Sequence, residues 1–85
     1  MKIEFDPEKD AINRAKHGIS LARAVDLSDV IVVEDRRYKE ARFRLYGQID
    51  GEWHCAAVTQ RDDAVRIINL RRAHRKEVSR HVRAR

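Results

Sequence analysis

The N-terminal third of the chain carries the hydrophobic pattern of a short strand followed by two helices. Residues 2–5 read as a strand, and Asp6-Pro7-Glu8 then predicts a helix start, because Asp caps the first turn and Pro fits the first helical position. This helix should run to about His17 and end at Gly18. Ser20 predicts the cap of a second helix. The apolar faces expected for the two helices are Ala11, Ile12 and Ala15 in the first, and Leu21, Ala24 and Val25 in the second.

From residue 28 onward the hydrophobic period changes to that of extended strands. A β-branched run fills residues 30–33, and residues 41–45 alternate apolar side chains with arginines. Asp50-Gly51 predicts a hairpin into a strand over residues 52–59, which is apolar on both faces as a central strand would be. A turn at residues 61–63 should lead into a last strand over residues 65–70, and a basic helix should begin near Ala73.

This order of elements, β-α-α-β-β-β-β-α, predicts an α+β domain. We expect two N-terminal helices, a mostly antiparallel sheet of about four strands and a C-terminal basic helix. A chain of 85 residues supports one hydrophobic core, so residues 1–85 should form a single domain with a thin core. No apolar run approaches the roughly 20 residues that cross a bilayer, and no signal peptide opens the chain, so we expect a soluble, cytoplasmic protein.

Positive charge is concentrated in the second half of the chain. Residues 1–43 hold 9 basic and 9 acidic side chains, whereas residues 44–85 hold 10 basic and 5 acidic ones and therefore the whole net charge of +5. Within residues 64–85 every basic side chain except Lys76 is an arginine, and Glu77 is the single acid. Such a segment either attracts a polyanion or forms a solvated basic tail.

Several kinds of chemistry are excluded by the residues that the chain lacks. The four histidines at positions 17, 54, 74 and 81 are scattered and have no carboxylate at ligand spacing, so no metal site is predicted. Cys55 is the only cysteine, which rules out an internal disulfide and favours a buried, unreactive thiol. No glycine-rich phosphate loop or nucleophile elbow is present, so no cofactor is expected.

Arginines gather on the predicted sheet and on its C-terminal edge, where like charges would repel unless an anion lay between them. The predicted members are Arg42 and Arg44 on one strand, Arg61 at a turn, Arg66 on the last strand, and Arg71 and Arg72 where that strand passes into the final helix. RNA phosphates are the anion that best suits this set. Among the aromatic side chains, Tyr38 and Tyr46 are the candidates for contact with a base, while Phe43 and Trp53 are assigned to the core.

An ordered set of short motifs resembles the BrnT toxin family over nearly the whole chain. The set consists of Phe5-Asp6-Pro7-Glu8-Lys9, Asn13, Lys16-His17-Gly18-Ile19-Ser20, Ala24, Glu40-Ala41-Arg42, Gly47, Thr59-Gln60-Arg61, the run from Arg66 to Ala73, and Glu77. Each motif alone is weak, but their order is specific. Two positions depart from the usual family pattern: Asn69-Leu70 stands where members usually read Ser-Ala, and His81 where many carry a tyrosine.

The resemblance implies a type II toxin–antitoxin toxin with a RelE-like fold that acts as a ribonuclease and inhibits translation. Its implied partners are RNA, a BrnA-like antitoxin with a ribbon-helix-helix-like DNA-binding domain in a heterotetramer with a toxin dimer, and, where cleavage depends on translation, the ribosome. The implied mechanism is metal-independent attack of a ribose 2′-OH on the adjacent phosphate. We expect catalysis from Arg61, Arg66, Arg71, Arg72, Glu40 and His17, and RNA binding from Arg42, Arg44, Tyr46, Arg75 and Lys76. His81 is a further acid–base candidate.

Structural interpretations compete with these roles. Glu40 would serve equally as an ion-pair partner of Arg42 or Arg44, and His17 as a favourable charge at a helix C-terminus. Glu77 would pair with Arg71 or Arg80 to hold the last helix. At the level of the whole protein, a ribonuclease, a non-catalytic RNA- or ribosome-binding module, and an interaction module that receives an acidic antitoxin all fit the basic face.

Overall fold

The computed structural model describes residues 2–83, which form an α+β fold built on a five-stranded sheet. The elements are β1 (Ile3–Glu4), α1 (Pro7–His17), η1 (Leu21–Asp26), β2 (Ser28–Asp35), β3 (Arg42–Ile49), β4 (Glu52–Arg61), β5 (Ala64–Arg72), α2 (Arg75–Glu77) and η2 (Val78–Arg83). The strand order is β1-β5-β4-β3-β2, and all described pairs are antiparallel except β1 with β5. The predicted α+β class with a mostly antiparallel sheet is confirmed, but the sheet has five strands rather than about four, because residues 3–4 pair with β5.

The caps of α1 lie where the sequence predicts them. Asp6 has extended backbone angles, and its carboxylate accepts a 2.9 Å hydrogen bond from the Glu8 amide. Pro7 occupies the first turn, and Gly18 ends the helix with a φ of 72°, a left-handed conformation that glycine adopts without strain. The chain therefore leaves α1 in a sharp turn toward η1.

The second predicted helix is a 3₁₀ helix, η1, rather than an α-helix. Ser20 caps it as expected, accepting from the Ala22 amide at 3.1 Å. The Asp10 carboxylate on α1 accepts from both the Ser20 hydroxyl, at 2.9 Å, and the Leu21 amide, at 2.7 Å. These bonds tie the two helices together and hold the start of η1 against α1.

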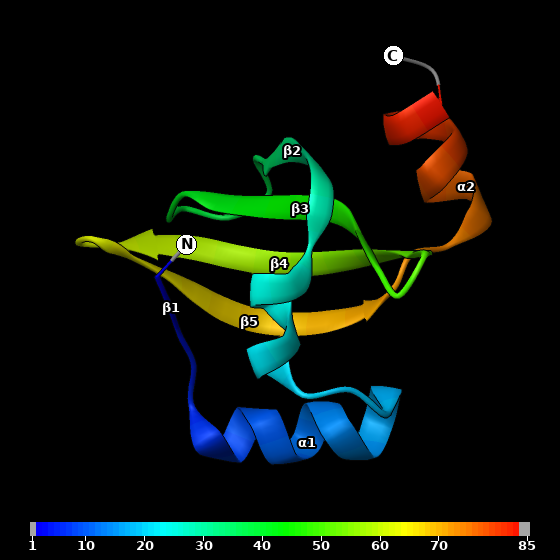
Figure 1. Cartoon of the computed structure of the whole chain (residues 1–85). Coiled ribbons are helices and arrows are strands. Elements are labelled where there is room, and N and C mark those ends of the chain that lie inside the picture. The colour runs from blue at the N-terminus through cyan, green and yellow to red at the C-terminus, as the bar shows by residue number, and fades with distance from the viewer. Residues whose placement is uncertain (1, 84–85) are drawn as a thin grey trace.

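Figure 1 shows η1 lying across one face of the sheet, and a hydrophobic core lies between the two. The buried apolar residues of this cluster are Leu21, Ala24, Leu45, Ile49, Ala56, Val58, Ile67 and Leu70. Phe43 packs against them, as predicted, whereas Trp53 is half-buried. The hairpin at Asp50-Gly51 is confirmed, and both residues have positive φ angles of 53° and 78°. Strand β4 lies in the interior of the sheet between β3 and β5, which explains its apolar pattern on both faces.

The predicted apolar face of α1 does not face the core. Ile12 is 65% exposed and Ala11 and Ala15 are also exposed, whereas Asn13 is only 4% exposed. The Asn13 amide donates to the carbonyls of Leu70, at 2.8 Å, and Ile19, at 2.9 Å, and its oxygen accepts from the Leu70 amide at 3.1 Å. Helix α1 therefore docks on the free edge of β5 through hydrogen bonds rather than through apolar contact. In η1, Val25 is likewise exposed instead of buried.

The C-terminal helix begins close to the predicted position. His74 precedes its first turn, α2, and the Glu77 carboxylate accepts from the His74 amide at 2.9 Å in a capping box. The chain continues as the π-helical η2 to Arg83. Arg85, which belongs to the predicted basic tail, lies outside the described residues.

We predict that Asn13→Leu destabilises the protein by about 3 kcal/mol, because the substitution leaves buried backbone groups of Leu70 and Ile19 without hydrogen-bond partners. Urea unfolding followed by circular dichroism measures the effect. The control is Ile12→Ala on the exposed side of the same helix, which should change stability by less than about 0.5 kcal/mol. Equal stability of the two variants would contradict the docking role of Asn13.

Candidate functional site

The face of the sheet opposite the core is polar and carries the predicted site arginines of β3. Successive strand residues point to opposite faces, so Phe43 and Leu45 face the core while Arg42 and Arg44 point away from it. Arg71 joins them on this face, because Cys55 of β4 pairs with Tyr46 on one side and with Arg71 on the other. We call this surface the open face. Helices α2 and η2 cover one end of it.

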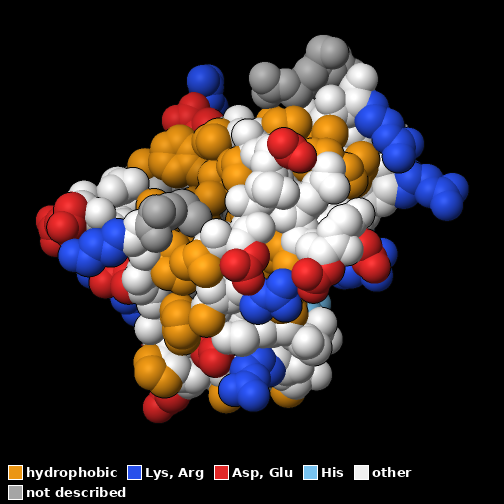
Figure 2. Space-filling view, viewed as in Figure 1, with side chains coloured by type: hydrophobic (Ala, Val, Ile, Leu, Met, Phe, Trp, Pro, Cys, Tyr) orange, Lys and Arg blue, Asp and Glu red, His pale blue; other side chains and the backbone are white. Residues whose placement is uncertain are grey.

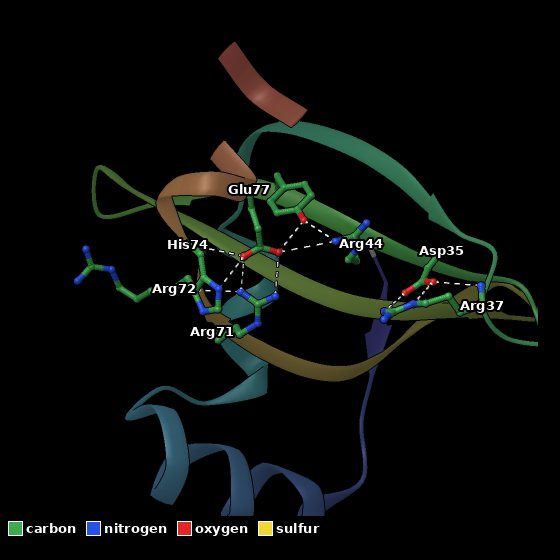
Figure 3. Close-up of polar contacts among 8 residues, drawn as sticks. Asp35, Arg37, Arg44, Arg71, Arg72, His74 and Glu77 are labelled. Atoms are coloured by element: carbon green, nitrogen blue, oxygen red, sulfur yellow. Dashed lines mark hydrogen bonds and ion pairs between the residues drawn. The ribbon is translucent and has the colours of Figure 1, made fainter. Parts of the chain in front are cut away.

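Glu77 of α2 is the centre of a group of polar contacts at the covered end of the open face. Arg71 donates to both of its carboxylate oxygens, at 2.7 and 3.0 Å, and the Tyr46 hydroxyl donates at 2.8 Å. Arg44 donates to the Tyr46 hydroxyl at 3.0 Å and lies 3.7 Å from Glu77. Figure 3 shows the Arg71 and Arg44 side chains pointing toward the Glu77 carboxylate. We call Glu77, Tyr46, Arg44, Arg71 and His74 the Glu77 cluster, in which the pairing of Glu77 with Arg71 is confirmed.

Tyr46 cannot serve as an exposed platform for an RNA base, which corrects the sequence-based prediction. Its side chain is 0% exposed, because it is enclosed on the open face between the sheet and the C-terminal helix. The His81 ring stacks on it with centroids 5.1 Å apart and an interplanar angle of 17°. Tyr46 lies on the same face of β3 as Arg42 and Arg44, and no pattern in the sequence indicates that η2 covers it. The buried Tyr46 hydroxyl thus bonds to both Glu77 and Arg44 and helps to hold them in position.

The contacts of the Glu77 cluster set the charge states of its members. Hydrogen bonds from Arg71 hold the pKa of Glu77 at about 2, against an ordinary value of 4.5, so the carboxylate is ionised at neutral pH. Burial, together with the bond to Glu77, raises the pKa of Tyr46 and keeps the phenol protonated. Desolvation lowers the pKa of His81, and the charges of Arg44 and Arg80 lower it further. This cluster therefore holds fixed positive charge beside a neutral imidazole.

A cleft beside β5 brings together four of the predicted site residues. It has a volume of about 410 Å³, and Glu40, Arg42, Arg61 and Arg66 all line it. Glu40 is paired with Arg42 at 2.8 Å, so the ion-pair interpretation of Glu40 holds even though the carboxylate also lines the cleft. We call this the lateral cleft. The arrangement collects three guanidinium groups around a space large enough for a phosphodiester.

Two further hollows adjoin the lateral cleft at a bulge in β5. Val58 pairs with Ile67 and Ala57 with Asn69, which leaves Ile68 as an extra residue in the strand. Ile68 lines the lateral cleft, a groove of about 260 Å³ beside α1, and a cleft of about 130 Å³ on the open face. We call the latter two the α1 groove and the central cleft. The bulge is thus the point where all three meet.

His17 lies in the α1 groove together with Lys16 and Asn69, so the structure brings it to the same region as the arginines. Its pKa is lowered by desolvation and by the positive charges of Lys16 and Arg71, which keeps the imidazole neutral at pH 7. A neutral imidazole can accept a proton. The helix-end interpretation also holds, since His17 is the last residue of α1.

Of the remaining predicted residues, Arg44 and Arg71 line the central cleft, whereas Arg72 lines none of the three hollows. Arg71 and Arg72 are neighbours in β5 and point to opposite faces. Arg72 is 71% exposed, pairs with Glu52, and is directed away from Glu77 in Figure 3. Arg75 and Lys76 are exposed on α2 and line none of the three hollows.

Sequence reasoning missed Arg37 and Asn69, both of which line the central cleft. Arg37 is held by Asp35, with hydrogen bonds of 2.7 and 2.9 Å to its two oxygens. The spacing of Asp35 and Arg37 gave a weak signal, because a turn after β2 can fold an arginine back on the preceding carboxylate. Sequence analysis singled out Asn69 only as a departure from the family pattern, and no residue pattern predicts the bulge beside it.

A separate apolar groove lies on the other side of the sheet, along η1 and β2. It has a volume of about 570 Å³ and is lined by Val25, Leu27, Val30, Val32, Phe43, Leu45, Val58, Gln60 and Val65. Figure 2 shows hydrophobic side chains gathered on this side of the molecule between charged ones. The groove contains none of the predicted site residues, so it is distinct from the arginine-lined clefts.

Among residues 2–83, no group of three or more His, Cys, Asp or Glu side chains is arranged so that it could hold a metal ion. None of the helices in this range has the length and apolar character needed to cross a membrane.

Comparisons with known proteins agree with one another. Residues 5–77 match the model of a family described as the ribonuclease toxin BrnT of type II toxin–antitoxin systems. The crystal structure of the Brucella abortus ribonuclease toxin BrnT is similar to this fold, with a TM-score of 0.74 and 24% sequence identity over 88% of this chain and 99% of that one. No curated protein matches the sequence.

We predict that Glu77→Gln lowers the stability of the protein by about 2 kcal/mol at pH 7, because Arg71 and Arg44 lose their ionised partner. The folded pKa of Glu77 is below its ordinary value, so the carboxylate stabilises the fold above pH 4.5 and loses this effect as pH falls toward about 2. Urea unfolding of both proteins between pH 7 and pH 2 should therefore show the difference shrinking.

The control for this series is Glu52→Gln, which removes an exposed ion pair with Arg72 and should cost less than about 1 kcal/mol. A difference between Glu77→Gln and the unaltered protein that stays constant with pH would show that Glu77 acts through shape and not through charge.

Proposed function

Because the chain belongs to the BrnT family of ribonuclease toxins of type II toxin–antitoxin systems, we propose that it cleaves RNA without a metal ion, by attack of a ribose 2′-OH on the adjacent phosphate. The reaction would take place where the lateral cleft meets the α1 groove. Cleavage of RNA needed for translation would then arrest growth.

One observation carries this proposal. Arg61, Arg66 and Arg42 line one cleft, and this cleft meets the groove that contains His17 at the bulge residue Ile68. Cleavage by 2′-OH attack requires positive charge on the phosphate oxygens and a proton acceptor beside the ribose. In this proposal the arginines of the lateral cleft supply the positive charge, and His17 of the α1 groove supplies the proton acceptor.

In the proposed reaction the 2′ oxygen attacks phosphorus in line with the 5′ oxygen of the next nucleotide. A bond forms between O2′ and phosphorus, the bond between phosphorus and O5′ breaks, and the products are a 2′,3′-cyclic phosphate and a 5′-OH. The non-bridging oxygens gain negative charge in the transition state. Arg61 and Arg66 would stabilise this charge, and Arg42 would add to it while Glu40 holds its guanidinium in place.

We assign the general base to His17, whose neutral imidazole can take the 2′-OH proton. The leaving 5′ oxygen takes up a proton from solvent. Glu40 is the less suitable base, because its carboxylate is held by Arg42. His81 stacks on the buried Tyr46, so its role would be to support the Glu77 cluster.

As a type II toxin, the protein has an antitoxin as its partner. We propose that this antitoxin is BrnA-like, with a ribbon-helix-helix-like DNA-binding domain, and that two toxin chains and two antitoxin chains form a heterotetramer. Support comes from family membership and from the basic charge of the chain, which suits an acidic neutralising segment.

The second candidate function is a non-catalytic module that binds RNA or the ribosome through the same arginines. The observation in its favour is that the arginines of the clefts are fixed by carboxylates in an arrangement that would bind a polyanion without any proton transfer. The two functions differ in whether the RNA chain is cut.

We predict that the purified protein cleaves labelled single-stranded RNA in the presence of EDTA and leaves 2′,3′-cyclic phosphate ends, detected by mass spectrometry. Arg66→Ala should lower the cleavage rate about 100-fold, because it removes a donor to the phosphate oxygens. Arg72→Ala should change the rate less than about threefold, since its side chain points away from the clefts.

The control is Arg23→Ala, which removes an arginine that pairs with Asp26 and Asp50 and lines none of the clefts. Cleavage that EDTA abolishes would contradict the metal-independent mechanism. Tight, salt-sensitive RNA binding without any cleavage would favour the binding module instead.

A further inference from the structure

The central cleft is a small hollow on the open face that concentrates positive charge. Its volume is about 130 Å³, and Arg37, Arg42, Arg44 and Arg71 line it against the single carboxylate of Asp35. Repulsion among four guanidinium groups disfavours such a gathering unless anions compensate it. The charge and size of the hollow therefore suit one phosphate group.

Each of these arginines has a carboxylate partner, and Arg44, which lies 3.7 Å from Glu77, also has an unused donor. Arg37 is bound by Asp35, Arg42 by Glu40 and Arg71 by Glu77. The Nε atom of Arg44 is buried and has no hydrogen-bond acceptor among the described residues. A buried N–H of a charged group without an acceptor is unfavourable, so a ligand oxygen that reached it would remove that penalty.

Tyr38 lies at the rim of the same cleft and offers an aromatic surface. Its side chain is 44% exposed, and the guanidinium of Arg42 lies 4.0 Å from the ring centroid. This cation–π contact holds the ring in the loop between β2 and β3. An exposed aromatic ring next to a phosphate-sized, positive hollow is the combination that single-stranded nucleic acids use, through base stacking and charge.

The central cleft adjoins the lateral cleft, which is part of the proposed cleavage site. Arg42 and Ile68 line both the central and the lateral cleft, so adjacent nucleotides of one strand could occupy the two hollows. We propose that the central cleft is a nucleotide-binding subsite that holds a phosphodiester of the RNA near Arg37 and Arg44 and stacks the attached base on Tyr38. This inference rests on the proposed function, since it names how that site holds its substrate.

The test uses a fluorescent single-stranded 2′-O-methyl RNA, which has no 2′-OH to attack and cannot be cleaved by the proposed mechanism. Fluorescence anisotropy gives Kd for the unaltered protein and for Tyr38→Ala, which should bind about tenfold more weakly because the stacking surface is lost. Tyr38→Phe keeps the ring and should retain the affinity. Tyr38 is exposed in a loop, so its replacement leaves the core intact.

Oligonucleotides with one abasic nucleotide, placed at each position in turn, locate the stacked base. At one position the abasic change should weaken binding about tenfold to the unaltered protein and have no further effect on Tyr38→Ala, because both changes remove the same contact. Arg37→Ala should lower the slope of log affinity against log salt by about 0.7, the value for one phosphate contact with a single strand. The control Arg36→Ala alters the neighbouring arginine, which pairs with Glu34 and does not line the cleft, and should leave Kd within about twofold.

A Tyr38→Ala effect that is equal for intact and abasic oligonucleotides at every position, or no effect at all, would overturn the subsite. Cleavage of the matching all-ribose RNA is measured in parallel. If the RNA is cleaved but no abasic position loses its effect in Tyr38→Ala, the subsite is refuted and the proposed function stands. If one abasic position does lose its effect in Tyr38→Ala but the RNA is not cleaved, the subsite is supported and the proposed function is refuted.

Discussion

The contact between Asn13 and the backbone of Leu70 is the constraint on which the arrangement of the clefts depends. Strand β1 pairs with β5 only at Val65 and Arg66, so the edge of β5 beyond them has no strand partner within residues 2–83. One buried amide side chain satisfies both backbone groups of Leu70. Because this contact fixes α1 beside β5, it places Lys9, Lys16 and His17 along the edge where the lateral cleft and the α1 groove lie.

Pairing of arginines with the Glu77 carboxylate organises the covered end of the open face. A single carboxylate, Glu77, binds Arg71 through two hydrogen bonds and lies close to Arg44, while the buried Tyr46 hydroxyl links them. These contacts hold the guanidinium groups of Arg44 and Arg71 in place, so little reorganisation would be needed for a phosphate to bind in the proposed subsite. The positive charge left uncompensated on the open face would then be available to the proposed RNA substrate.

Local signals in the sequence predicted the elements well and their packing less well. The caps at Asp6 and Gly18 and the Asp50-Gly51 hairpin are short-range features, and each has the predicted structure. Packing depends on distant residues: the apolar side of α1 is exposed because Asn13 docks the helix, and Tyr46 is buried because η2 covers it. The clefts could not be predicted, because the bulge at Ile68 that joins them is a matter of strand register, which single-sequence patterns do not record.

The pairing of Asn13 with Leu70 also has a consequence for how the protein is made. The two residues lie 57 positions apart, near opposite ends of the described chain. During synthesis α1 leaves the ribosome early, but its docking edge does not exist until β5 has followed it out and paired with β4. A nascent chain therefore carries no completed clefts until β5 has paired with β4. The proposed ribonuclease site would assemble only at that stage, so a chain that stopped before β5 would lack it.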